Sequence, residues 1–159
     1  MTLQDTSSCP CGTGLSTPQC CGRYHQGEPA PTPEALMRSR YTAFVLELHD
    51  YLLTTWHSST RPRTLAPDPQ TQWKGLSIVK SELDSPKASS QTEGGSVHFR
   101  AYFKERERWH MLEENSRFVK EGGRWWYVNG TPVVVRLKPR RNDPCFCGSG
   151  RKLKLCCKE

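Results

Sequence analysis

The stretch CFCGSGRKLKLCC, residues 145–157, contains two cysteines one residue apart, eight further residues and then a vicinal cysteine pair. The stretch CPCGTGLSTPQCC, residues 9–21, repeats this C-x-C-x8-C-C spacing near the other end of the chain. Together the two copies contain all eight cysteines of the 159-residue protein. The sequence therefore predicts a middle region that is flanked by two matched cysteine modules.

Four thiolates this close in sequence suit a tetrahedral metal site, in which zinc is bound by sulfur at about 2.3 Å. A closed set of four cysteines is typical of a structural site and not of a catalytic one. The predicted ligands are Cys9, Cys11, Cys20 and Cys21 in the first module and Cys145, Cys147, Cys156 and Cys157 in the second. Zinc is the expected ion at both sites, but tetrahedral sulfur sites also suit iron, and the spacing does not distinguish the two metals.

A disulfide framework is the main alternative to metal binding. Neighbouring cysteines could pair only with strain, because the bond needs Cα atoms about 4.4–6.8 Å apart and suitably directed side chains. Pairing between the two ends would not explain why the spacing is repeated. No signal peptide precedes the first module, so we expect a reducing, cytoplasmic location in which thiols persist. Redox-active thiols are a further alternative, although no cysteine of either set is distinguished from its neighbours.

The chain carries a formal net charge of +7, and its basic residues are unevenly distributed. Two Zn²⁺ ions with eight thiolates would lower this charge to about +3. From residue 136 onward, eight lysines and arginines accompany only two acidic residues, which predicts a local basic patch. Lys152 and Lys154 lie in this patch, and we expect them to contact an acidic partner; a solvated tail is the alternative. No apolar run approaches the roughly 20 residues of a membrane span.

The middle of the chain has the pattern of two helices followed by an antiparallel sheet. Thr32 and Pro33 are typical of a helix start, and apolar residues at helical spacing predict a helix over 33–48. A shorter helix is predicted over 50–57. Alternating and aromatic-rich segments predict strands over 73–83, 97–104, 106–118 and 124–128, with turns at 122–123 and 129–130. The expected class is therefore α+β, and the predicted units are residues 1–28, 29–138 and 139–159.

Residues 145–157, with Gly148-Ser149-Gly150 and the basic Lys152 and Lys154, resemble the SEC-C motif, the metal-binding tail of the SecA translocation ATPase. The segments CGRYHQG (residues 21–27) and ALMRSRY (residues 35–41) extend the likeness, so that nearly the whole chain resembles the YchJ family of bacterial proteins. This resemblance implies two SEC-C sites around a domain similar to nuclear transport factor two, in which helices pack on a curved, cone-like antiparallel sheet. It implies no function, because the family is uncharacterised.

Three functions are compatible with the sequence. The first is a cytoplasmic, metal-binding accessory protein without catalytic activity, whose two structural sites present a basic surface to a protein or ribonucleoprotein partner. By resemblance to the SecA tail, this partner would act in protein export or at the ribosome. The second is a small-molecule enzyme or ligand binder that uses a pocket in the middle domain. The third is nucleic-acid binding through the basic C-terminal segment.

Polar residues of the middle region are the candidates for a pocket; they are His57, His98, His110, Asp50, Glu113 and Glu114. His57 and Asp50 fall at predicted helix ends, where capping roles are the simpler interpretation. The sequence contains no glycine-rich phosphate loop, nucleophile elbow or histidine-rich catalytic metal motif. A non-enzymatic function is therefore favoured.

Overall fold

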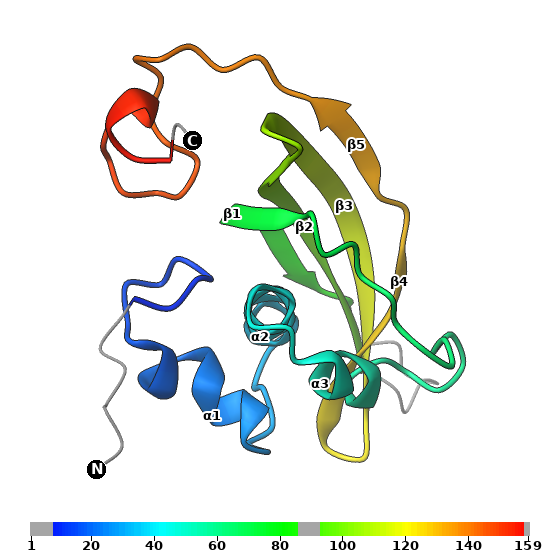
Figure 1. Cartoon of the computed structure of the whole chain (residues 1–159). Coiled ribbons are helices and arrows are strands. Elements are labelled where there is room, and N and C mark those ends of the chain that lie inside the picture. Colours follow the sequence, from blue (N-terminus) through cyan, green and yellow to red (C-terminus); the bar gives the residue numbers. More distant parts are fainter. Residues whose placement is uncertain (1–7, 86–92, 158–159) are drawn as a thin grey trace.

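The computed structural model describes residues 8–85 and 93–157. Its helices are η1 (Thr17–Gln19), α1 (Cys21–His25), α2 (Pro33–Val45), α3 (His49–Thr54) and η2 (Leu153–Leu155). Its strands are β1 (Gln72–Leu83), β2 (Glu93–Glu105), β3 (Arg108–Glu121), β4 (Arg124–Gly130) and β5 (Val133–Arg136). The strands form one curved antiparallel sheet, with α2 and α3 on one of its faces (Figure 1). The predicted α+β class is confirmed.

The sheet follows the chain in the order β1-β2-β3-β4, and β2 and β3 pair along their whole length. Alternate residues of β2 point into the core, as the period-two pattern predicted: Val97, Phe99, Ala101 and Phe103 are all buried. Gly122 and Gly123 have φ values of +62° and +79° and form the predicted hairpin turn between β3 and β4. The β2–β3 turn consists of Arg106 and Glu107, which adopt positive φ values without glycine.

The predicted turn at residues 129–130 is wrong, because both residues belong to β4. Strand β4 pairs with β3 as far as Gly130, and β5 then pairs with the same edge of β3 from Val133 onward. Strands β4 and β5 thus lie along the same edge of β3 and are separated by residues 131–132. Pro132 lacks the backbone N–H that an uninterrupted ladder would need, which accounts for the break.

Helix α2 begins where the sequence predicted, since Thr32 Oγ1 accepts a hydrogen bond from Ala35 N at 3.0 Å. It ends at Val45 and not at residue 48, and the left-handed conformation of Glu47 follows the end of the helix. The predicted capping role of Asp50 is wrong. Leu48 occupies the N-cap position of α3 without a side-chain hydrogen bond, and Asp50 lies in the first turn.

Helix α2 is buried on more than one face. Leu36, Met37 and Tyr41 lie in the hydrophobic core with the sheet, whereas Ser39 and Thr42 are buried although they are polar. The reason is that the N-terminal module covers the side of α2 that faces away from the sheet (Figure 1). The first cysteine module, α2 and the sheet therefore form successive layers. Among the described helices, none has the length and apolar character needed to cross a membrane.

Candidate metal centres and a central cavity

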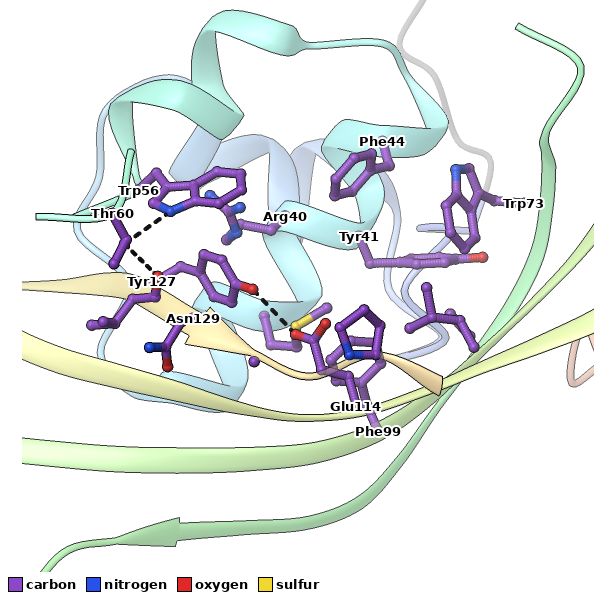
Figure 2. A pocket seen from close by; sticks show the side chains of 16 residues that line it. Arg40, Tyr41, Phe44, Trp56, Thr60, Trp73, Phe99, Glu114, Tyr127 and Asn129 are labelled. Carbon is purple, nitrogen blue, oxygen red and sulfur yellow. Dashed lines mark hydrogen bonds between the residues drawn. The ribbon is translucent and has the colours of Figure 1, made fainter. Parts of the chain in front are cut away.

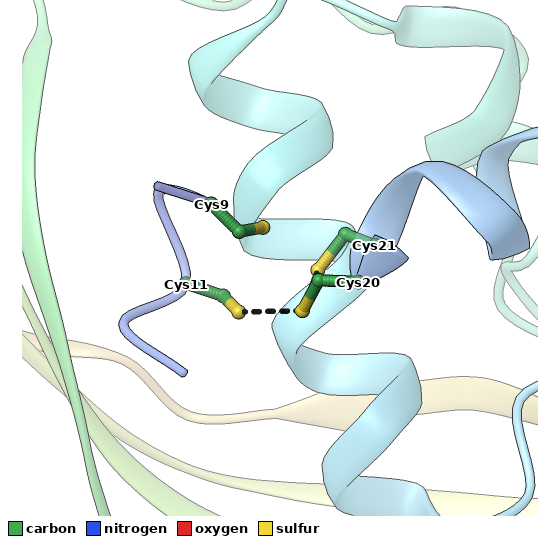
Figure 3. A group of neighbouring side chains, drawn as sticks. All are labelled: Cys9, Cys11, Cys20 and Cys21. Atoms are coloured by element: carbon green, nitrogen blue, oxygen red, sulfur yellow. Dashed lines mark hydrogen bonds between the residues drawn. The ribbon is translucent and has the colours of Figure 1, made fainter. Parts of the chain in front are cut away.

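The structure gathers the cysteines into two clusters, as the sequence predicted. Within each cluster the four Sγ atoms all lie within 4.8 Å of one another; the clusters are Cys9, Cys11, Cys20 and Cys21, and Cys145, Cys147, Cys156 and Cys157. Figure 3 shows the first cluster, in which the sulfurs of a loop and of the start of α1 converge. All eight cysteines are free thiols. Each cluster therefore offers four sulfur ligands to one ion.

The two modules have the same backbone structure. The first cysteine of each module donates its N–H across the loop, Cys9 to Leu15 O at 2.7 Å and Cys145 to Arg151 O at 2.9 Å. The two glycines after the second cysteine have φ values of +89° and +86° in the first module and +82° and +80° in the second. A short 3-10 helix, η1 or η2, then precedes the vicinal pair. Since both modules need left-handed glycines at the same positions, their sequence repeat is also a structural repeat.

The first cluster lies inside the main core. All four cysteines are buried and belong to the same hydrophobic cluster as α2 and the sheet. Cys9 Sγ lies 3.5 Å from Thr42 Oγ1, and Arg38 Nη1 donates to Cys11 O at 2.6 Å. Hydrogen bonds with the neighbouring thiols, followed by burial, raise the pKa of Cys21 well above the ordinary thiol range. A cation would reverse this preference, because metal binding favours the thiolate form.

The second cluster is more exposed and has a separate small core. Cys145 is buried, but the other three cysteines are only half-buried. The ring of Phe146 stacks on Tyr102 at a centroid distance of 4.7 Å and contacts Trp109 at 5.0 Å. Leu153 completes this small core. Phe146 and Leu153 thus pack the second module against the sheet.

Both modules approach the same point of β1. A Cβ added to Gly75 would lie 1.9 Å from the carbonyl oxygen of Phe146, so the second module contacts the backbone of β1 there. A Cβ added to Gly12 would lie 3.9 Å from the carbonyl oxygen of Leu76, the next residue of the strand. The two modules therefore lie on one side of the molecule with β1 between them (Figure 1).

A basic cleft adjoins the second module. Its cavity volume is about 330 Å³, and its cationic side chains are Arg108, Arg136, Lys138, Arg141 and Lys154. Glu107 is the one acidic residue in its wall, and the buried Trp109 and Leu153 also line it. Of the two lysines that the sequence singled out, Lys154 lines the cleft, whereas Lys152 is exposed and lies outside its wall.

A larger, mostly apolar cavity of about 530 Å³ lies between α2 and the sheet (Figure 2). Of the six candidate pocket residues from the sequence, only Glu114 lines it. Figure 2 shows the Glu114 carboxylate directed from the sheet toward the helices, among rings that include Tyr41, Trp56 and Tyr127. The sequence candidates omitted Arg40, which is 3% exposed and also lines this cavity.

The other candidates lie elsewhere. His57 Nε2 is 2.8 Å from Glu121 Oε2, and the backbone N–H of His57 donates to Tyr127 O at 2.7 Å. His57 therefore connects the segment after α3 to β4. The sequence predicted only a helix-capping role for this residue. His98 contacts Glu113 at 2.7 Å on the opposite face of the sheet. The ring of His110 stacks on Phe103, and Asp50 is exposed. The described lining of the cavity contains no histidine.

The fold and the cysteine clusters define a protein in which cysteine modules flank a domain of the nuclear-transport-factor-two type. The model of the YchJ middle NTF2-like domain matches residues 32–130, and the SEC-C motif matches residues 141–159. The chain therefore belongs to the YchJ family, whose curated members carry the name UPF0225. The first cluster lies outside both matched segments, although its backbone structure is that of the second.

Relatives and solved structures agree with this assignment. The chain is 43% identical to the UPF0225 protein of Enterobacter sp. (strain 638), over 96% of this chain and 98% of the relative. It is 42% identical to the UPF0225 protein of Vibrio parahaemolyticus, over 95% and 98%. The crystal structure of a SEC-C motif containing protein from Psychrobacter arcticus is similar with a TM-score of 0.62, 31% identity and 98% coverage of both chains. The solution structure of a SEC-C motif containing protein from Rhodopseudomonas palustris gives a TM-score of 0.65 and 31% identity, over 80% of this chain and 99% of that one.

Proposed function

We propose that this protein is a cytoplasmic, metal-binding interaction protein. Each cysteine cluster holds one structural zinc ion, and the second module presents the basic cleft to an acidic segment of a partner protein. The observation that carries the proposal is the pair of equivalent four-cysteine clusters, one of which adjoins the cleft.

The spacing of the sulfurs supports a tetrahedral metal site, for which zinc is the expected ion. Four sulfurs at about 2.3 Å from a central ion occupy a tetrahedron whose edges are about 3.8 Å long. In the first cluster, Cys20 Sγ lies 3.5 Å from Cys11 Sγ and 3.9 Å from Cys21 Sγ. In the second, the equivalent distances from Cys156 are 3.4 Å and 3.8 Å. Because all four positions are filled by protein sulfur, the ion would have a structural and not a catalytic role.

Elemental analysis of the natively purified protein is expected to find about two zinc ions per chain. After chelation under denaturing conditions, all eight cysteines should react as free thiols, because each would have been a metal ligand. Iron in place of zinc would change the ion and keep the structural role. Absence of metal combined with fewer than eight reactive thiols would show that the clusters form disulfides, and the proposal would fail.

The form of the cleft favours an acidic peptide over nucleic acid. Its cationic side chains converge on a compact, partly apolar cavity, whereas single-stranded nucleic acid is bound along an extended basic groove with exposed aromatic rings. Trp109 is buried, so its ring is not available to stack on bases. Lys154 and Arg141 lie together at this cleft, because Lys154 N donates to Arg141 O at 3.0 Å.

Charge reversal at the cleft is expected to abolish capture of acidic peptides. The probe is a fluorescein-labelled peptide with six consecutive glutamates. We expect the double variant Lys154→Glu and Arg141→Glu to bind this peptide at least tenfold more weakly, as measured by fluorescence anisotropy. Lys120→Glu, near the far end of β3, is the single-charge control and should change the affinity by less than threefold. Lys152→Glu tests separately whether this exposed lysine contributes.

Two results would contradict the cleft proposal while leaving the metal sites untouched. One is an unchanged affinity in the double variant with full metal content. The other is tighter binding of a single-stranded RNA oligomer than of the peptide, with an affinity that falls steeply as salt increases.

A further inference from the structure

The cavity between α2 and the sheet has the size and walls of a small-molecule site. Its volume of about 530 Å³ lies within the usual range of roughly 300–1,000 Å³ for ligand pockets. Tyr41, Phe44 and Trp73 form one end of it, and Trp56 and Tyr127 form the other (Figure 2). None of the eight cysteines lines it. Any ligand function of this cavity is thus separate from the proposed metal sites and basic cleft.

Arg40 brings a positive charge to this apolar cavity. Its Nη1 donates to Leu52 O and to Thr55 Oγ1, both at 2.7 Å, and its guanidinium carbon lies 4.5 Å from the ring centroid of Tyr127. The ring of Trp56 lies 5.2 Å away. Burial lowers the pKa of Arg40 to about 10, so that the side chain stays protonated at neutral pH. These contacts fix the guanidinium, while Nε and Nη2 meet no hydrogen-bond acceptor within the described residues.

Glu114 brings a negative charge to the same cavity. Both of its assigned hydrogen bonds reach Oε2, from Ser116 Oγ and, at 3.3 Å, from the Tyr127 hydroxyl. Oε1 receives no donor from the part of the chain that the structure describes. Among the described buried side-chain atoms, only Trp125 Nε1 lacks a partner, so Oε1 of Glu114 and Nε and Nη2 of Arg40 keep some accessible surface, and both residues line the cavity.

The two charges are not paired with each other. The ion pairs of the described residues do not include Arg40 with Glu114, although both side chains line one cavity. Fixed donors on one side and a free acceptor on the other would be satisfied by a group that both accepts and donates hydrogen bonds. A buried polar group without a partner is costly, so such a ligand is favoured over a purely apolar one.

We propose that this cavity binds an uncharged, planar aromatic molecule that carries a primary or secondary carboxamide. The amide oxygen accepts from Arg40, the amide N–H donates to Oε1 of Glu114, and the aromatic body fills the space between the rings. The charges of Arg40 and Glu114 cancel, so an anionic or cationic ligand would leave a net charge buried. A zwitterion would keep the balance but would have to lose the hydration of two charges.

Ligand binding to the full-length, metal-loaded protein tests this inference. The probes are 2-naphthamide and three matched compounds, namely 2-naphthoate, 2-(aminomethyl)naphthalene and the zwitterion 3-(2-naphthyl)alanine, each titrated by saturation-transfer difference NMR. We expect the amide to bind at least tenfold more tightly than the other three. Ala101→Leu places a larger side chain in the cavity wall and should weaken the binding of 2-naphthamide by tenfold or more.

A conservative variant separates recognition from a merely structural role. In Glu114→Gln the side-chain oxygen can still accept from Ser116 and Tyr127, which directs the new NH₂ group into the cavity in place of Oε1. The preference should therefore reverse, so that 2-naphthoate binds more tightly than 2-naphthamide. Glu113→Gln, at the neighbouring residue on the opposite face of the sheet, is the matched control and should leave the preference unchanged. Equal affinity of all probes, absence of binding, or an unchanged preference in Glu114→Gln would overturn the inference.

Discussion

Replacement of Cys11 and Cys20 by serine is expected to remove one metal ion and to destabilise the whole chain. Both residues are buried in the core that contains α2 and the inner face of the sheet. Loss of this site would detach the N-terminal module and expose the side of α2 that faces away from the sheet. Metal binding in small cysteine sites contributes about 10–16 kcal/mol, so we expect the free energy of unfolding to fall by more than about 4 kcal/mol. Elemental analysis and thermal unfolding monitored by tryptophan fluorescence would measure both effects.

The equivalent change in the second module is the matched control. Cys147 and Cys156 are half-buried and belong to a separate small core. Replacing both by serine should also remove one ion, but it should lower the melting temperature of the sheet by only a few degrees. The same asymmetry predicts that a chelator releases the second ion first, since its ligands are more accessible. Equal destabilisation by the two double variants would refute the assignment of the first site to the core.

Arg40→Ala is expected to be among the most destabilising single changes in the middle domain. The substitution removes two hydrogen bonds that fix the end of α3, together with the stacking of the guanidinium on Trp56 and Tyr127. It also leaves Glu114 without the nearby positive charge and enlarges the cavity. A loss of about 3–5 kcal/mol in the free energy of unfolding follows from these effects together. Urea denaturation, followed by far-UV circular dichroism, would measure the loss.

Arg117→Ala supplies the control for this experiment. Arg117 donates to Asp84 through both terminal nitrogens, at 3.0 Å and 2.6 Å, but both side chains are about half exposed. Exposed ion pairs contribute about 0–1 kcal/mol, so this arginine should matter little. Arg40→Lys should lie between the two, because an ammonium keeps the charge but cannot reproduce the planar contacts with two rings. If Arg40→Ala is no more destabilising than Arg117→Ala, the buried guanidinium has no structural role.

The cysteine spacing predicted the two four-cysteine clusters because the determinants of each module are local. A thirteen-residue segment contains its four sulfurs and the glycines that let its loop turn. The start of α2 and the alternation of β2 were likewise predictable, since Thr32 and the pattern around Phe99 depend only on near neighbours. The clustering itself is confirmed by the structure, whereas the binding of an ion and its identity stay predictions.

The cavity could not be predicted in the same way. Arg40 has the sequence character of an exposed helical residue, and its burial depends on contacts with α3 and β4 that lie far along the chain. Position in sequence also gave six polar candidates without showing which face of the sheet each one occupies. Glu113 and Glu114 are adjacent, yet only Glu114 faces the cavity, because successive side chains of a strand point to opposite faces. Tertiary contacts, and not the local sequence, decide which face of β3 packs against the helices.

The placement of the two modules on either side of β1 also has a consequence for biosynthesis. The first module and α2 precede every strand of the sheet in the chain, so both emerge from the ribosome before the sheet can form. The second module must dock on Gly75, seventy residues earlier in the chain than Cys145, and it needs β1 already paired in the sheet. In the proposed function, the first ion would act as a nucleus for folding of the nascent chain. The second module would dock only on a sheet that is already assembled, and its docking would mark the completion of folding.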